Sequence, residues 1–386
     1  MNRSIKPFVE FGTGATAILA FLTPTVVVLW NITPFRDRGS DPRVETVPST
    51  PSSSGVPQTY NYPSTVAAPK SFGVEPGTQT CAGPGGSISA LAYSKEGVIA
   101  VGTEDGNVSF FDGECRGARV QLRLFGHVSA LTFDEAGNRV YVGTYEKDGD
   151  RRRGYIRAYG LGGSSRPEAE SAAVDGDVNS IELSSDGETV YSTGNGVRRW
   201  TRELQPIAAG GGSLSAIGID DPHVADLAVA RYPTGTEAVF ALGTLGKLYK
   251  VDTETWQAQA LVTGCGTSAY SLAATQRHLF VVGANCIYAL DHSGEKANDI
   301  FNFRFPVGFS ALTVAAVDAA HETVVLAGQR DEGPNRLYLL DPTTGNGGAI
   351  ETGARGPIFN VALRSDGRAV AADEEGAVRI WTVRNA

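Results

Sequence analysis

The sequence has few of the residues that carry most enzyme and metal chemistry. Among 386 residues there are five histidines, four cysteines and one methionine. No HExxH, GxSxG or P-loop motif occurs, and these motifs supply, in turn, a zinc site, a serine nucleophile and a phosphate-binding loop. Because His and Cys are also not grouped at ligand spacing, we predict no metal site, no cofactor and no catalytic residue.

Positive charge is also in deficit. The chain has 33 Lys and Arg against 42 Asp and Glu, which gives a formal net charge of −9. A surface that binds nucleic acid generally needs an excess of positive charge to face the phosphates. The composition therefore argues against general affinity for nucleic acid.

Long hydrophobic runs are absent except at the N-terminus, where Phe11 to Phe35 contains no charged residue. A run of this length is enough for a helix to cross about 30 Å of hydrocarbon. We predict a short tail over residues 1–7 and a transmembrane signal-anchor helix over residues 8–35. A cleaved signal peptide is the alternative, which the length of the run and the lack of a small-x-small site disfavour.

Residues 36–69 are rich in Ser and Pro and predict a disordered, flexible linker, because such a segment cannot bury enough apolar area to fold. Lys and Arg are nearly balanced across the predicted span, so the positive-inside rule does not fix its orientation. An even number of cysteines, the Ser/Thr/Pro linker and sequons at Asn31 and Asn107 favour an extracytoplasmic folded domain. We expect a single-pass membrane protein.

Glycine is abundant, with 47 residues, and from Ser87 onward a unit of three short strands and their tight turns recurs seven times. Each third strand ends on a large apolar residue, and these residues follow one another at intervals of 39 to 51: Phe111, Tyr159, Trp200, Val251, Leu290, Leu340 and Trp381. A period of this length with about four strands per unit is typical of a β-propeller. We predict an all-β fold, a seven-bladed β-propeller over residues 70–386.

The third strands end in "FFD", "KVD", "ALD" and "LLD", with "RWT" and "IWT" in two others. This pattern resembles the WD-repeat signature, and "LFGHVSALTF" resembles the Gly-His that opens such repeats. No intact Trp-Asp pair is present, and the chain is equally similar to YVTN-type and quinoprotein-like propellers. The resemblance covers Ser87 to the C-terminus and implies the propeller architecture.

The chain stops after the strand in "GAVRIWTVRNA", which leaves the last unit with three strands. An uncovered strand edge promotes aggregation, and closed folds remove such edges. We expect residues of about 70–80, just before the first repeat, to provide the missing fourth strand and so close the ring.

Two connections between second and third strands are long and basic. One contains Arg151, Arg152 and Arg153, and the other contains Arg330 and Arg336. Loops on a rigid frame commonly carry binding sites, and uneven charge can orient a partner. We predict these five arginines as partner-binding residues, with solvated loop charges as the alternative.

Cys265 precedes the first strand of the fifth unit, and Cys286 begins its third strand. Both positions map to the same rim, which makes a disulfide between them plausible; two buried thiols are the alternative. The sequence suggests no partner for Cys81 or Cys115.

The sequence thus leads to two hypotheses about function. The first is a membrane-tethered propeller that serves as a protein-interaction scaffold without catalytic activity. The second is an exported propeller enzyme, a lactonase-like hydrolase or a quinoprotein-type dehydrogenase. The absence of a recognisable ligand set favours the first.

Overall fold

The computed structural model describes residues 73–74, 79–81, 85–113, 115, 118–149, 151–162, 164–208, 223–231, 237–261, 265, 269–275, 278–283, 286–291, 309–317, 323–330, 335–341, 346–352, 356–364, 368–372 and 376–384. Every regular element in these ranges is a β-strand, which confirms the predicted all-β class. The predicted tail, membrane helix and linker lie outside these ranges. Within them, nothing qualifies as a helix long and apolar enough to span a membrane.

The described strands form seven antiparallel sheets, numbered here in chain order. Sheet 1 contains β3 (Ile88–Tyr93), β4 (Val98–Thr103), β5 (Asn107–Asp112) and β6 (Ala118–Arg123). Sheet 2 contains β7 (His127–Phe133), β8 (Arg139–Asp148), β9 (Arg151–Gly160), β10 (Ala169–Glu170) and β11 (Val174–Asp175). Sheet 3 contains β12 (Ile181–Leu183), β13 (Thr189–Gly194) and β14 (Gly196–Thr201).

The later sheets repeat this plan. Sheet 4 contains β15 (Val224–Arg231), β16 (Glu237–Gly243), β17 (Leu248–Asp252) and β18 (Ala258–Leu261). Sheet 5 contains β19 (Ala269–Ala274), β20 (His278–Gly283) and β21 (Cys286–Asp291). Sheet 6 contains β22 (Phe309–Val317), β23 (Thr323–Arg330), β24 (Arg336–Asp341) and β25 (Asn346–Glu351). Sheet 7 contains β26 (Asn360–Leu363), β27 (Arg368–Ala372) and β28 (Val378–Arg384), with β1 (Gly73–Val74) and β2 (Gln79–Cys81) paired to β28.

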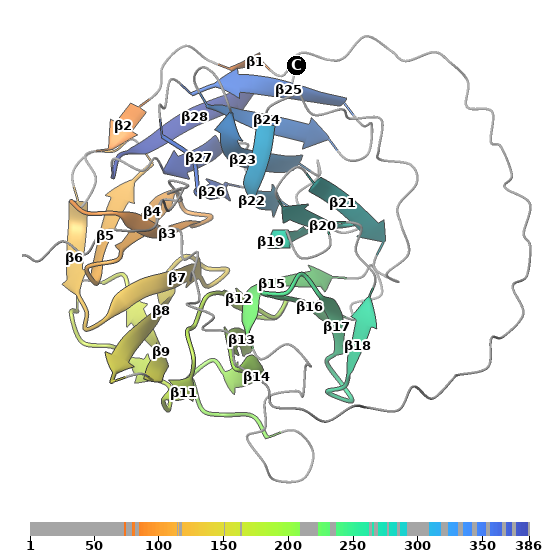
Figure 1. Ribbon diagram of the computed structural model, residues 1–386. Helices are drawn as coiled ribbons and strands as arrows, with labels where there is room; N and C mark the ends of the chain where they lie inside the picture. The colour runs from red at the N-terminus through yellow and green to blue at the C-terminus, as the bar shows by residue number, and fades with distance from the viewer. Residues whose placement is uncertain are drawn as a thin grey trace, which may run out of the picture. The chain divides into compact units, whose positions relative to one another are not determined.

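The seven sheets stand around a common axis with their first strands innermost (Figure 1). Each first strand contacts the first strand of the next sheet, in the order β3, β7, β12, β15, β19, β22 and β26, and β26 contacts β3 in turn. The sheets therefore form a closed ring. We call the end where first strands begin and second strands connect to third strands the upper rim, and the opposite end the lower rim.

The hydrophobic core lies between neighbouring sheets. One cluster joins sheets 1 and 2 through Phe110, Val128 and Tyr159, and others join sheets 2 and 3, 3 and 4, 4 and 5, and 6 and 7. The large residues that end the third strands belong to this core wherever their side chains are described, since none is more than 4% exposed. Sheets 1, 2, 3, 4 and 7 thus bury both faces against their two neighbours, which a single unit could not do.

A β-bulge recurs at the start of several first strands, and in sheets 1 and 2 its side chain bonds to the next sheet. The register shifts at Ser89 and Ser129, and a bulge re-aims the side chain of the extra residue. The Ser89 hydroxyl donates to the Val128 carbonyl at 2.5 Å, and the Ser129 hydroxyl donates to the Val178 carbonyl at 2.6 Å. These bonds satisfy inner-strand carbonyls across the sheet boundary, and they show that consecutive first strands begin at the same end.

Glycine in the second strands permits this close approach. A Cβ on Gly102 would lie 2.4 Å from Cγ1 of Val128 in the next first strand, a distance that real Cβ atoms do not show. The recurring Gly in "VGT" is therefore a packing requirement, because only a residue without a side chain lets the next sheet come this near.

Sheet 7 is completed by the N-terminal strands. Gly73 and Val74 pair with Arg384 and Val383, and Gln79 to Cys81 pair with Ile380 to Val378. The two ends of the described chain thus share one sheet, at the place where the sequence analysis expected a closing strand from residues 70–80. This pairing covers the edge of β28 that the C-terminal strand would otherwise leave open.

A disulfide that the sequence did not predict joins this closing strand to sheet 1. Cys81 on β2 and Cys115, just after β5, are bonded with their Cα atoms 4.8 Å apart. Cys81 is fully buried in a cluster that contains Ile380 of sheet 7 and Phe111 of sheet 1. The bond therefore crosses the boundary at which the ring closes.

Replacing both of these cysteines should weaken the domain markedly. The bond closes a loop with a sequence separation of 34, for which the chain-entropy model gives about 4 kcal/mol. We expect Cys81→Ser/Cys115→Ser to lower the free energy of unfolding by about 2–4 kcal/mol in urea denaturation under oxidising conditions. An unchanged free energy would show that the closure is held without the bond.

Asp226 provides a buried polar connection between three sheets. Its carboxylate accepts hydrogen bonds from the Leu272 amide at 2.8 Å and the Ser271 hydroxyl at 3.0 Å, both in sheet 5. Ser180 of sheet 3 and the Leu227 amide also donate to it. Burial raises the pKa of Asp226 above its ordinary value of 3.8 despite these bonds, because the charged form is poorly solvated.

This raised pKa predicts a specific pH dependence. The folded state binds the Asp226 proton more tightly than the unfolded state, so the group contributes most stability below the unfolded pKa and loses it as pH rises through the folded pKa. We expect the free energy of unfolding of the wild type, minus that of Asp226→Asn, to fall as pH rises above the ordinary carboxyl pKa of 3.8.

Asp252→Asn is the matched control. Hydrogen bonds from the Thr255 amide and hydroxyl lower the pKa of Asp252, so its contribution is present above the unfolded pKa and is lost as pH falls through the folded pKa. If the free energy of unfolding of the wild type minus that of Asp226→Asn rose with pH, the raised pKa of Asp226 would be contradicted.

Candidate interaction surface

The longest hairpin in the described structure rises from the upper rim of sheet 2. Strands β8 and β9 each have ten residues. Strand β7 begins opposite Tyr145 and β11 ends opposite Arg153, so the hairpin tip beyond these residues stands above the sheet. Gly149 turns the chain at φ +63°, a left-handed conformation that Gly adopts without steric cost. The tip carries three of the predicted binding arginines.

These three arginines have different environments. In the strand register Arg151 lies opposite Asp148, and Arg153 lies opposite Glu146; cross-strand pairs of opposite charge stabilise a hairpin. Both arginines are exposed. All three are predicted from the sequence as partner-binding residues, but residues 146–153 contain four cations and three carboxylates and therefore carry a net charge of only +1.

Arg152 is part of the framework of the hairpin. It forms an ion pair with Asp177 of the β11–β12 connection, and its guanidinium lies 5.1 Å from the ring centroid of Tyr145. The ring of His127 also stacks on Tyr145, with the two ring centroids 4.7 Å apart and the ring planes nearly parallel. Burial raises the pKa of Tyr145, and Arg152 partly offsets this.

The remaining two predicted arginines lie elsewhere. Arg330 ends β23 and Arg336 begins β24, which places both at the upper rim of sheet 6. Figure 1 shows β24 across the ring from β9. The side chain of Arg330 lies outside the described side chains, and that of Arg336 is half-buried. The structure therefore does not bring the five arginines together into one surface.

The upper rim also carries apolar side chains that the sequence analysis missed. The exposed large hydrophobic residues among those described are Phe125 at 83%, Leu245 at 55% and Tyr270 at 46%. Phe125 lies between β6 and β7, Leu245 between β16 and β17, and Tyr270 at the second position of β19. All three positions belong to the upper rim.

A signal for these residues was present in the repeats. Leu245 occupies the turn "TLGK", where the first unit has the acidic turn "TEDGN", and Tyr270 occupies the bulge position held by Ser89 and Ser129 in other units. An exposed apolar residue where the equivalent units are polar favours an interaction surface.

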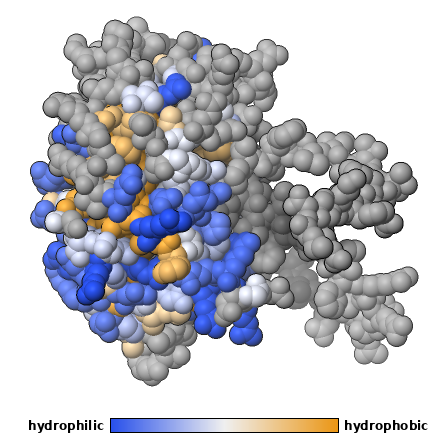
Figure 2. All heavy atoms as spheres, turned by 90° about the vertical axis from the view of Figure 1, so that its left-hand side faces the viewer, coloured by the Kyte–Doolittle hydropathy of each residue, from blue (hydrophilic) through white to orange (hydrophobic). Residues whose placement is uncertain are grey.

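The outer side of the ring differs from this rim. Figure 2 shows the side formed by β2, β6 and β9, which is largely hydrophilic with one apolar band. The apolar residues of the described strands are mostly enclosed between sheets, so this side resembles an ordinary protein surface.

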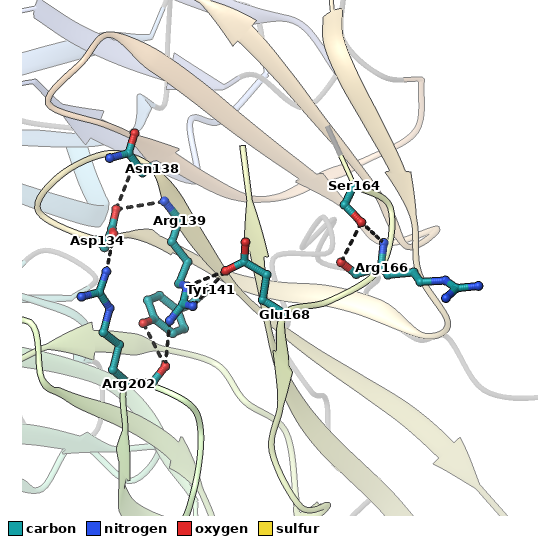
Figure 3. Close-up of polar contacts among 8 residues, drawn as sticks. All are labelled: Asp134, Asn138, Arg139, Tyr141, Ser164, Arg166, Glu168 and Arg202. Atoms are coloured by element: carbon teal, nitrogen blue, oxygen red, sulfur yellow. Dashed lines mark hydrogen bonds and ion pairs between the residues drawn. The ribbon is translucent and has the colours of Figure 1, made fainter. Parts of the chain in front are cut away.

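Polar side chains at the lower rim hold sheets 2 and 3 together (Figure 3). Asp134 accepts from the Asn138 and Arg139 amides at 2.8 and 3.0 Å and pairs with Arg202 of sheet 3 at 3.3 Å. The carbonyl of Arg202 accepts from both Arg139 and Tyr141 at 3.2 Å. These groups are used in joining the two sheets.

The predicted Cys265–Cys286 bond is only partly described. Cys265 is disulfide-bonded and buried, and Cys286 begins β21 opposite Gly283. The side chain of Cys286 lies outside the described side chains, so the pairing stays a prediction. In the part of the chain that the structure covers, no group of three or more His, Cys, Asp or Glu is placed to hold a metal ion.

The solved structures include many of this shape. The β-propeller domain of Cps50 (Swd1) from Myceliophteria thermophila superposes with a TM-score of 0.57 over 78% of this chain and 97% of its own, at 16% sequence identity. The fold is a β-propeller. No protein-family model matches the sequence, and no curated protein matches it significantly.

An identity of 16% to this propeller shows the architecture alone. The propeller fold carries many unrelated functions, and 1466 solved chains match this one, so the function has to be inferred from the surface of this propeller. Its upper rim carries the exposed large apolar side chains among the described residues.

The division of roles among the arginines can be measured. Removing Arg152 would leave the nearly buried carboxylate of Asp177, 10% exposed, without its cation, whereas Arg151 is exposed. We expect Arg152→Ala to lower the free energy of unfolding by about 1–3 kcal/mol and Arg151→Ala by less than about 0.5 kcal/mol. Equal losses in urea denaturation would contradict a structural role for Arg152.

Proposed function

We propose that this chain is a seven-bladed β-propeller that binds a partner protein at its upper rim and acts as an interaction scaffold without catalytic activity. The observation that carries the proposal is the location of Phe125, Leu245 and Tyr270, the exposed large apolar residues of the described chain, on one rim. Exposed aromatic and aliphatic side chains on a rigid frame favour protein binding.

The two rims differ in a way that supports this choice of face. At the lower rim the Asp134–Arg202 network is occupied in joining sheets. At the upper rim Arg151 and Arg153 are exposed at the tip of the β8–β9 hairpin, which extends beyond the other strands of sheet 2. Charges arranged unevenly on one face orient an approaching partner and raise its association rate.

We further propose that residues 8–35 tether the propeller to a membrane through the linker 36–69, with the propeller on the extracytoplasmic side. The uncharged run from Phe11 to Phe35 supports the tether. The side of the membrane is supported by cysteine chemistry, since no described cysteine is free and disulfides persist in oxidising compartments.

Site-directed photo-cross-linking of the full chain in intact cells tests this function. A cross-linker placed at Lys247 or Asp175 on the upper rim should capture a specific protein, and one at Glu203 or Glu254 on the lower rim should not; all four side chains are exposed. Arg151→Glu/Arg153→Glu should reduce capture at least tenfold, because the hairpin charge is inverted.

Equal capture from both rims would contradict the proposed face. Labelling of Lys247 by a membrane-impermeant amine reagent in the same cells reports the side of the membrane, and protection from the reagent would overturn the extracytoplasmic placement.

A further inference from the structure

Phe125 is the most exposed large apolar side chain that the structure describes, at 83%. Burying such a side chain against a partner is favourable, and aromatic residues are enriched among those that dominate binding energy. Leu245 and Tyr270 are already about half covered, so they have less area to gain.

The backbone that carries Phe125 is held firmly by its neighbours. The Leu124 amide donates to the Gly106 carbonyl at 2.8 Å. A Cβ on Gly106 would lie 2.5 Å from the Leu124 carbonyl oxygen, and one on Gly126 would lie 2.3 Å from that of Tyr145. The loop is thus packed between the β4–β5 turn and the β8–β9 hairpin. Presentation of the ring on a fixed backbone lowers the entropy cost of binding.

The β4–β5 turn beside Phe125 is acidic and lacks a cation. It contains Glu104 and Asp105, and among the described residues no Lys or Arg lies within salt-bridge distance of either carboxylate. A third carboxylate, Glu146, lies next to Gly126 but is 3.7 Å from Arg157. Glu104 is half-buried, and this burial raises its pKa, an effect that the neighbouring His127 partly offsets.

An incompletely solvated carboxylate without a cation gains from an approaching positive charge. The same two carboxylates repel phosphate, which disfavours nucleic acid and anionic lipid headgroups as ligands. The surface therefore fits a ligand that presents an apolar group next to a positive charge.

We propose that Phe125, Glu104 and Asp105 form a docking surface, the Phe125 surface, for a protein segment that presents an apolar side chain next to a Lys or Arg. This proposal rests on the scaffold function and names the class of segment that the upper rim receives. The exposed Arg151 and Arg153 on the adjacent hairpin favour an acidic residue further along the same segment.

Two synthetic ten-residue peptides of equal apolar content test the chemistry, one with Lys and Arg beside Leu and Phe, the other with Asp and Glu in their place. Binding to the full chain is measured by fluorescence anisotropy at low and at moderate salt. We expect the basic peptide to bind at least tenfold more tightly. Phe125→Ala should weaken its binding about tenfold at both salt concentrations, while Glu104→Gln/Asp105→Asn should weaken it chiefly at low salt.

Glu203→Gln and Glu254→Gln, which replace exposed carboxylates on the lower rim, are the matched controls and should change binding less than twofold. Thermal melts establish that each variant is folded. A preference for the acidic peptide, an unchanged affinity of Phe125→Ala for the basic peptide, or binding of vesicles with anionic lipid in place of the basic peptide would overturn the proposal.

The failure of this inference can be told apart from failure of the scaffold function. If the cross-linked partner of the upper rim is retained by Phe125→Ala and by Glu104→Gln/Asp105→Asn, the Phe125 surface is wrong while the scaffold function stands. If neither rim captures a partner, the scaffold function itself fails. Loss of the captured partner in Phe125→Ala but not in Glu203→Gln would support both.

Discussion

The structure depends on the mutual burial of sheets that cannot bury themselves. A sheet of three or four short strands has two apolar faces, and here each face is covered by the neighbouring sheet, as in the cluster that joins sheets 1 and 2. Covering every face without leaving one exposed requires a closed circle of sheets. The contact of β26 with β3 is the step that completes the circle.

Closure explains several features that are otherwise unrelated. The N-terminal strands pair with β28, and the Cys81–Cys115 bond joins β2 to sheet 1. Both features secure the boundary between sheets 7 and 1, where the ring closes. Inner-strand side chains serve the other boundaries. Ser89, Ser129 and Asp226 each bond the following sheet, so polar groups near the axis satisfy one another as the apolar faces pack.

A ring secured in this way leaves its rim loops free to vary. The β8–β9 hairpin extends beyond its sheet without weakening it, because the Arg152–Tyr145–His127 stack ties its base to the rim. The acidic β4–β5 turn and the cations of the hairpin tip then lie on either side of Phe125. Such a juxtaposition of opposite charges around an apolar side chain suits the orientation of a protein partner more than the chemistry of a small substrate.

The sequence by itself determined the all-β class, the recurring three strands and the burial of residues such as Phe111, Trp200 and Trp381, because strand periodicity and repeat length are local properties. It also indicated that the last unit lacked a strand. Only the tertiary structure decided that Cys81 meets Cys115, that Arg152 is structural while Arg151 is exposed, and that Arg336 lies across the ring from them. These facts depend on which rim positions of different sheets become neighbours, and twist and ring closure set those neighbours, not spacing along the chain.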